Sequence, residues 1–156
     1  MKRLYLMRHG HSPSIASAGV PSDALRPLSD RGREDVRCVC AELLRREDAP
    51  DLILHSPLTR AAQSAAAASA TLTPRQGVHV FAPLDNTRSA EDVFSALSKR
   101  ADNVEAILAI GHQPQIGEIA ALLVRAAFDI GPATIIALDL KTTPRVLWIL
   151  HPNNVP

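Results

Sequence analysis

Short apolar runs, each ending at a polar or glycine-containing segment, are the feature that most constrains the fold of this chain. They cover Leu4 to Met7, Leu52 to Leu54 and Ala106 to Ile110, and each is followed, directly or after a loop, by apolar residues at helical spacing. Nearly unbroken apolar runs of this length are typical of strands buried on both faces. Their alternation with helices predicts a three-layer α/β/α sandwich with a mostly parallel central sheet.

The rest of the sequence predicts a long loop, a closing hairpin and the remaining helices and strands. Residues 11–29 are rich in Ser, Pro and Gly and predict a long loop, which at this length is often functional. A turn over Lys141 to Pro144 predicts a closing hairpin with at least one antiparallel strand. The expected helices are Arg31 to Arg46, Pro57 to Leu72 with Ser56 as its N-cap, Ala90 to Arg100 and Gln115 to Phe128. The other expected strands are Val78 to Phe81, Thr134 to Leu140 and Val146 to Leu150.

Size and charge narrow the class of protein. The 156 residues, 46% of them hydrophobic, suit a single domain over residues 1–156 with one substantial core. With 17 basic and 16 acidic residues, the chain has no overall field that would attract nucleic acid or an anionic membrane. The oligomeric state stays open.

The chain start and the cysteines indicate a cytoplasmic protein. Only four apolar residues follow Arg3 before Arg8, which is too short for a signal peptide, and no run approaches the length of a membrane span. Cys38 and Cys40 point to different faces of the expected helix, so we expect neither a disulfide nor a metal pair between them.

Three expected strand-to-helix junctions carry residues suited to chemistry. They contain Arg8 and His9, then Arg60, then His112. Because ligands of open α/β sheets bind at the carboxyl ends of the strands, these side chains can converge there. Two arginines and two histidines without an obligatory carboxylate partner favour a dianion, and guanidinium groups match phosphate oxygens. Helix N-termini after Ser56 and Gly111 would add anion affinity. The sequence therefore predicts a phosphate site.

These motifs resemble the histidine phosphatase superfamily, whose fold is phosphoglycerate-mutase-like. Arg8 to Gly10 resembles its R-H-G, and Gly111 to Pro114 its G-H-x-P. Ser56 to Ser64 resembles S-P-x-x-R-A-x-Q-T, with Ser64 in place of the usual Thr. Arg26 to Ser29, followed by Gly32-Arg33, is similar to a stretch of the short bacterial SixA-type phosphohistidine phosphatases. The resemblance covers nearly the whole chain.

The resemblance implies a role for each residue. His9 would attack phosphorus and carry the phosphoryl group, for which its imidazole must be neutral. Gly10 would let the backbone approach the phosphate closely. Arg8, Arg60 and a protonated His112 would stabilise the charge on the phosphoryl oxygens, so no metal or other cofactor is needed. Arg26 could reach the pocket from the long loop.

The substrate class depends on the general acid. The loop that carries a carboxylate acid in larger family members here reads Pro83-Leu84-Asp85-Asn86-Thr87, so Asp85 could be that acid or could cap its loop. Without a strong acid, alkoxide groups leave poorly, whereas an imidazole is protonated near neutral pH. This favours a phosphohistidine-bearing protein, such as the phosphotransfer domain of a signalling relay, as the partner.

Three other interpretations stay open. The first is a phosphatase of a small phosphorylated metabolite, with Asp85 as the acid. The second is a phosphate-binding module without turnover, against which the intact pair of His9 and His112 argues. The third is a metal pair of His9 and His11, as in barrel hydrolases, but such barrels need roughly 250 residues, so we expect His11 at the pocket rim or in solvent.

Overall fold

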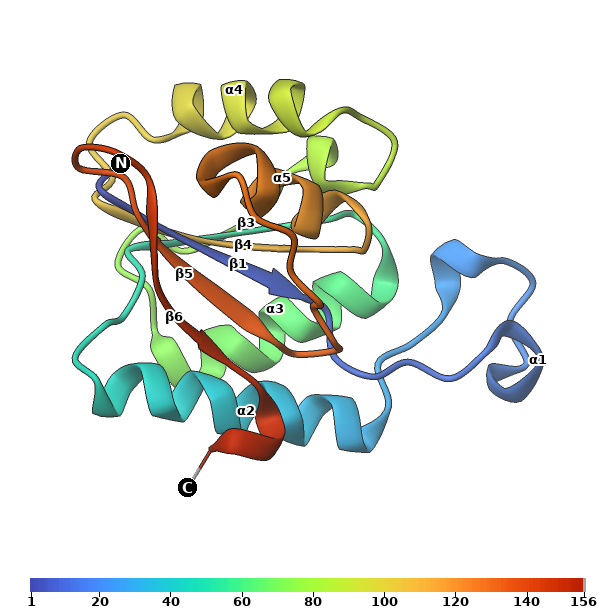
Figure 1. Cartoon of the computed structure of the whole chain (residues 1–156). Helices are drawn as coiled ribbons and strands as arrows, with labels where there is room; N and C mark the ends of the chain where they lie inside the picture. Colours follow the sequence, from blue (N-terminus) through green and yellow to red (C-terminus); the bar gives the residue numbers. More distant parts are fainter. Residues whose placement is uncertain (156) are drawn as a thin grey trace.

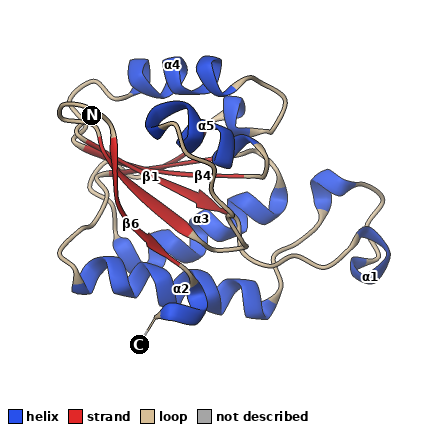
Figure 2. Cartoon of the chain, in the orientation of Figure 1, coloured by secondary structure: helices blue, strands red, loops and turns tan. Residues whose placement is uncertain are grey.

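A six-stranded sheet with helices on both faces forms the centre of the molecule (Figures 1 and 2). The computed structural model describes residues 1–155, so only the last residue of the expected domain lies outside it. The sheet order is β3-β2-β4-β1-β5-β6. β1 to β4 run parallel, and β5 is antiparallel to both of its neighbours. The strands are β1 (Arg3–Arg8), β2 (Leu52–His55), β3 (Val78–Val80), β4 (Ala106–Gly111), β5 (Ile135–Asp139) and β6 (Arg145–Leu150). The expected α/β sandwich with a mostly parallel sheet is confirmed.

Alternating side chains of the strands divide the core into two halves. In β1, Leu4 and Leu6 face one half while Tyr5 and Met7 face the other, and all four are fully buried. Helices α4 and α5 cover the first half, and α2 and α3 cover the second (Figure 1). The helices are α1 (Ile15–Ala18), α2 (Asp30–Arg45), α3 (Thr59–Leu72), α4 (Ala90–Arg100) and α5 (Gln115–Val124), with short 3-10 turns η1 (Asp23–Leu25), η2 (Ala82–Leu84) and η3 (Pro152–Asn154). None of the helices within residues 1–155 is long and apolar enough to cross a membrane.

Two helix boundaries differ by two or more residues from the sequence prediction. Helix α3 begins at Thr59 with Leu58 as its N-cap, so the prediction of a Ser56 cap was wrong. The Ser56 hydroxyl instead contacts His112 and accepts the Leu58 N–H, which places a turn before the helix. Helix α5 ends at Val124, four residues before the expected Phe128, because Arg125 adopts a left-handed conformation with φ of 54°.

The long loop projects from the body beyond the carboxyl end of β1 (Figure 1). We call residues 11–29 the arm. It is more structured than predicted, because it contains the single turn α1 and the 3-10 turn η1. Ser14 caps the start of α1, and Gly19 ends it with φ of 64°. None of the residues of α1 is buried, so the arm is held mainly by its two ends and by η1.

The base of the arm is fixed by a contact between two glycines. A Cβ on Gly10 would lie 2.6 Å from the Gly32 carbonyl oxygen, and a Cβ on Gly32 would lie 2.3 Å from the His11 carbonyl oxygen. Any side chain at either position would therefore push the backbone of the residues after β1 away from the first turn of α2. The R-H-G segment and Gly32 are thus parts of one packed junction.

We predict that Gly32→Ala destabilises the protein. A glycine-to-alanine change inside a helix ordinarily stabilises by roughly 0.5–1 kcal/mol, but here the overpacked contact should cost about 1–3 kcal/mol. Urea denaturation measures the free energy of unfolding. Gly131→Ala is the matched control, because its nearest neighbour, Thr134 Oγ1, would lie 3.6 Å away. A Gly32→Ala protein as stable as the unmodified chain would contradict the steric argument.

Candidate active site

The sheet register brings the three predicted junctions side by side. Strands β2, β4 and β1 are adjacent, and Arg8 at the end of β1 pairs with Gly111 at the end of β4. Backbone hydrogen bonds continue past the strands, because His9 N–H donates to the Gly111 oxygen at 3.0 Å and Ser56 N–H to the Ile110 oxygen at 3.0 Å. The ring centres of His9 and His112 consequently lie 5.0 Å apart.

A polar cavity of about 340 Å³ opens at this sheet edge. Among residues 1–155, Leu58 is the only apolar one in its lining. A cavity so rich in hydrogen-bonding groups is suited to a charged ligand rather than an apolar one. Its lining residues are Arg8, His9, Asp23, Arg26, Leu58, Arg60, Asp85, Asn86, His112 and Gln113.

His9 is held in the form required of a nucleophile. Its Nδ1 lies 2.7 Å from the Gly10 carbonyl oxygen, which can only accept, so Nδ1 carries the proton and Nε2 keeps its lone pair. Burial, assisted by the neighbouring His112 and the guanidinium groups of Arg60 and Arg8, lowers the pKa of His9 to about 3, against the opposite effect of the hydrogen bond to Gly10. The imidazole is therefore neutral at pH 7.

Arg60 contacts both the nucleophile and the arm. Its Nε donates to His9 Nε2 at 3.1 Å. Its two terminal nitrogens donate to the backbone oxygen and to the carboxylate Oδ2 of Asp23, at 2.8 and 3.0 Å. In the ligand-free protein, the arm thus supplies an anionic partner for this buried arginine.

His112 lies deeper than His9 and is only 3% exposed. Its Nε2 lies 2.7 Å from Ser56 Oγ, and its Nδ1 is buried without a hydrogen-bond partner among the described residues. Burial, assisted by the positive charge of Arg60, lowers the pKa of His112 to about 4. His112 is thus neutral at pH 7 in the ligand-free protein, and its protonation beside a phosphoryl group stays a prediction.

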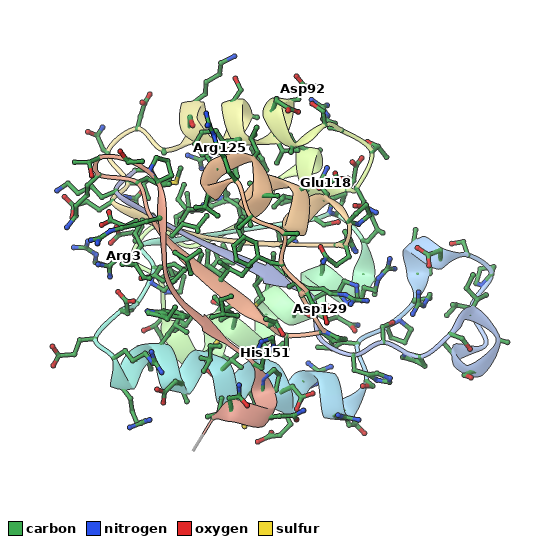
Figure 3. The ribbon with its side chains drawn as sticks, in the orientation of Figure 1. Arg3, Asp92, Glu118, Arg125, Asp129 and His151 are labelled. Carbon is green, nitrogen blue, oxygen red and sulfur yellow. The ribbon has the colours of Figure 1, made fainter. Side chains whose placement is uncertain are left out.

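The other two predicted arginines also line the cavity. Arg8 donates to the Ile130 oxygen at 3.2 Å, and its buried Nε has no partner within residues 1–155. Burial lowers the pKa of Arg8, against the opposite effect of Asp129, which Figure 3 shows at the edge where β1 ends. Arg26 reaches the cavity, but its three nitrogens donate to Pro13, Ser12 and Asp23, so it braces the arm as well.

Asp85, Gly10 and His11 have different positions. Asp85 lines the cavity, while its Oδ1 accepts hydrogen bonds from the Thr87 N–H and hydroxyl at 3.0 and 2.6 Å. Gly10 is absent from the cavity lining, and its close contact is with Gly32 rather than with the phosphate site. His11 lies outside the cavity, exposed, with Nδ1 2.7 Å from Ser29 Oγ. No three His, Cys, Asp or Glu side chains in the described part of the chain are grouped so as to hold a metal ion.

Several supporting residues were not given a role by the sequence reasoning. Ser64 Oγ accepts the Gly10 N–H at 3.0 Å, and Gln63 Oε1 accepts the Leu28 N–H at 2.8 Å. The sequence motif could have indicated the supporting roles of Gln63 and Ser64, because both residues lie one turn after Arg60 on the helix. Asp23 carried no such signal, since its contact with Arg60 depends on the path of the arm.

The sequence of residues 4–86 matches the family model described as the histidine phosphatase superfamily, branch 1. That match spans more than half of the chain. The chain belongs to the histidine phosphatase superfamily. Branch membership agrees with the R-H-G segment at the end of β1 and with the Ser56 to Ser64 segment, both of which lie inside the matched region. No curated protein matches the chain at the level of sequence.

Solved structures share the fold of this histidine phosphatase over nearly its full length. The protein histidine phosphatase SixA complexed with tungstate has a TM-score of 0.87 at 23% identity, covering 99% of both chains. The alpha-ribazole phosphatase from Shigella flexneri has a TM-score of 0.69 at 22% identity, covering 93% of this chain and 95% of its own. A phosphoserine phosphatase from Entamoeba histolytica has a TM-score of 0.68 at 16% identity, covering 96% of both. The phosphoglycerate-mutase-like fold is thus confirmed.

We predict that acid destabilises this histidine phosphatase through its buried histidine pair. The pKa values of His9 and His112 are both depressed in the folded chain, so below pH 6.5 the unfolded chain binds more protons than the folded one. The free energy of unfolding therefore decreases as the pH is lowered. Each histidine should lower the free energy of unfolding by about 1–2 kcal/mol between pH 7 and pH 5. His9→Gln should flatten this dependence in urea denaturation at several pH values. The control is the exposed His79→Gln, and an equal slope in all three proteins would contradict the prediction.

Proposed function

We propose that the chain is a metal-independent phosphatase that forms a phosphohistidine intermediate on His9 and acts on phosphohistidine in another protein. The observation that carries the proposal is the state of His9. Its Nδ1 is tied to the Gly10 oxygen, its Nε2 lone pair faces Arg60, and its imidazole is neutral beside the ring of His112. This combination is that of an activated nucleophile in an electropositive cavity.

The proposed reaction has two displacements. In the first, His9 Nε2 leaves its hydrogen bond with Arg60 and attacks phosphorus, while the bond from phosphorus to the leaving group breaks. The guanidinium groups of Arg8 and Arg60 stabilise the charge on the phosphoryl oxygens. In the second, water attacks phosphorus, the bond to His9 breaks, and phosphate and the free imidazole are released. The chemistry requires no group other than the side chains present and water.

Phosphohistidine is the favoured substrate because of its leaving group. The imidazole ring of phosphohistidine can be protonated on its other nitrogen near neutral pH, so the ring leaves as a neutral imidazole and the reaction does not depend on a strong acid from the enzyme. Asp85, the one candidate acid from its loop, already accepts two hydrogen bonds from Thr87 on Oδ1. The shared fold with the protein histidine phosphatase SixA supports the same choice. The partner would be a phosphotransfer domain or a similar phosphohistidine-bearing protein.

A second candidate is a phosphatase of a small phosphomonoester. The observation that favours it is the position of Asp85 in the cavity lining together with His112. Fold neighbours that are alpha-ribazole and phosphoserine phosphatases support it further. In that case Asp85 would protonate an alkoxide leaving group.

A substrate panel with Asp85→Asn separates the two candidates. On a phosphohistidine-bearing phosphotransfer domain, we expect Asp85→Asn to keep kcat/KM within about threefold of the unmodified enzyme, since imidazole leaves without this acid. On sugar phosphates and phosphoserine we expect little turnover by either protein. Efficient phosphomonoester hydrolysis that Asp85→Asn lowers about a hundredfold or more would instead establish the second candidate.

A trapped intermediate tests the nucleophile. Rapid quench with a phosphohistidine donor should add one phosphoryl group to the intact chain, with the label on His9, and His9→Ala should abolish both label and turnover because the attacking nitrogen is missing. Intact-mass and peptide mass spectrometry measure the label. His79→Ala, an exposed histidine on β3, is the matched control and should leave both unchanged. Phosphate binding with no labelled species and no turnover would indicate a binding module.

A further inference from the structure

Ser56 lies next to the second histidine of the site through the strand register. His55 pairs with Ile110, and the Ser56 N–H donates to the Ile110 oxygen, so Ser56 follows β2 at the level where β4 ends at Gly111, directly before His112. Its side chain is fully buried. The hydroxyl therefore has to find its hydrogen-bond partners within the protein.

The hydrogen bonds of Ser56 can be assigned by elimination. The Leu58 N–H can only donate, so Ser56 Oγ accepts it, at 3.2 Å. The other contact of Oγ is His112 Nε2 at 2.7 Å, and among the described residues Oγ forms no third hydrogen bond. If Nε2 were the donor, a buried O–H would be left without an acceptor. The arrangement that satisfies both groups has the Ser56 O–H donating to His112 Nε2.

This assignment decides which nitrogen of His112 carries its proton. A neutral imidazole has one N–H, so an Nε2 that accepts leaves the proton on Nδ1. His112 is neutral at pH 7 because burial lowers its pKa to about 4. Nδ1 is buried without a partner, and the ring lines the cavity 5.0 Å from the ring of His9. The Nδ1–H of His112 is therefore a hydrogen-bond donor without an acceptor among the described residues of the ligand-free protein.

We propose that Ser56 is a positioning residue that fixes His112 in the Nδ1–H tautomer, so that a neutral imidazole presents a donor to a phosphoryl oxygen. The proposal rests on the phosphatase function proposed above. In the other tautomer, Nδ1 would present a lone pair, which repels a phosphoryl oxygen. The hydroxyl of Ser56 thus controls whether His112 assists or opposes charge development at phosphorus.

Nuclear magnetic resonance of the unmodified protein tests the tautomer directly. The chain is labelled with ¹⁵N-histidine, and long-range ¹H–¹⁵N correlation spectra are recorded without ligand at pH 7.5. The resonances of His112 are those that disappear in His112→Asn. We expect a protonated Nδ1 and an unprotonated Nε2. A protonated Nε2 would overturn the proposal, whether or not the protein proves to be a phosphatase.

Variants at Ser56 connect the tautomer to function. Ser56→Ala should move His112 toward the Nε2–H form and lower kcat at least tenfold with a smaller change in KM, because the donor acts mainly on the transition state. Ser56→Thr keeps the hydroxyl and should restore the Nδ1–H form and most of kcat. Ser64→Ala removes another buried serine hydroxyl that does not contact His112, so the His112 spectrum should stay unchanged.

The outcomes separate this proposal from the proposed function. An unchanged His112 tautomer in Ser56→Ala, or an unchanged kcat despite a changed tautomer, would overturn the positioning role of Ser56. If the unmodified protein shows the Nδ1–H form but hydrolyses no phosphorylated substrate, the proposed function fails while the assignment of the tautomer stands. If Ser56→Ala does not fold, the spectrum of the unmodified protein and of Ser56→Thr still decides the question.

Discussion

Backbone pairing at one edge of the sheet is the constraint on which the rest of the site depends. The order β2-β4-β1 places the ends of three strands next to one another, although they are some fifty residues apart along the chain. Because the pairing continues beyond the strands through His9 and Ser56, main-chain hydrogen bonds hold the backbone at this edge, and side-chain hydrogen bonds then orient the two imidazoles. The two glycines at positions 10 and 32 then fix the path of the chain that leaves this edge.

The two histidines and the arginines of this site differ in charge state, although both are partly or fully buried. Withdrawal from water suppresses protonation of His9 and His112, and repulsion from the guanidinium groups already in the pocket adds to this effect. The arginines keep their charge under the same conditions, because the guanidinium pKa starts far above neutral. The site therefore combines fixed positive charge with a neutral nitrogen nucleophile, which a set of protonated histidines would not provide.

Features set by local pattern could be predicted from the sequence, and those set by tertiary contacts could not. The buried runs and the R-H-G and G-H segments identified the sheet edge and its four central side chains, because strand ends follow from hydrophobic periodicity. The neutral state of His112 in the ligand-free protein could not be predicted, since the depth of burial is not visible in the sequence. The roles of Asp23 and Ser56 were missed because each depends on a partner more than thirty residues away. The end of α5 was missed because Arg125 adopts a left-handed backbone that its residue type does not favour.

The carboxylate of Asp23 gives the ligand-free pocket a resident anion. It bridges Arg60 and Arg26, so an incoming phosphoryl group enters by exchange with a group tethered to the same chain. A tethered competitor acts at a high local concentration, which weakly bound solvent anions such as chloride do not match. A dianion with several acceptor oxygens can replace it on both guanidinium groups. In the ligand-free protein, the arm thus keeps both guanidinium groups paired with a carboxylate of the same chain.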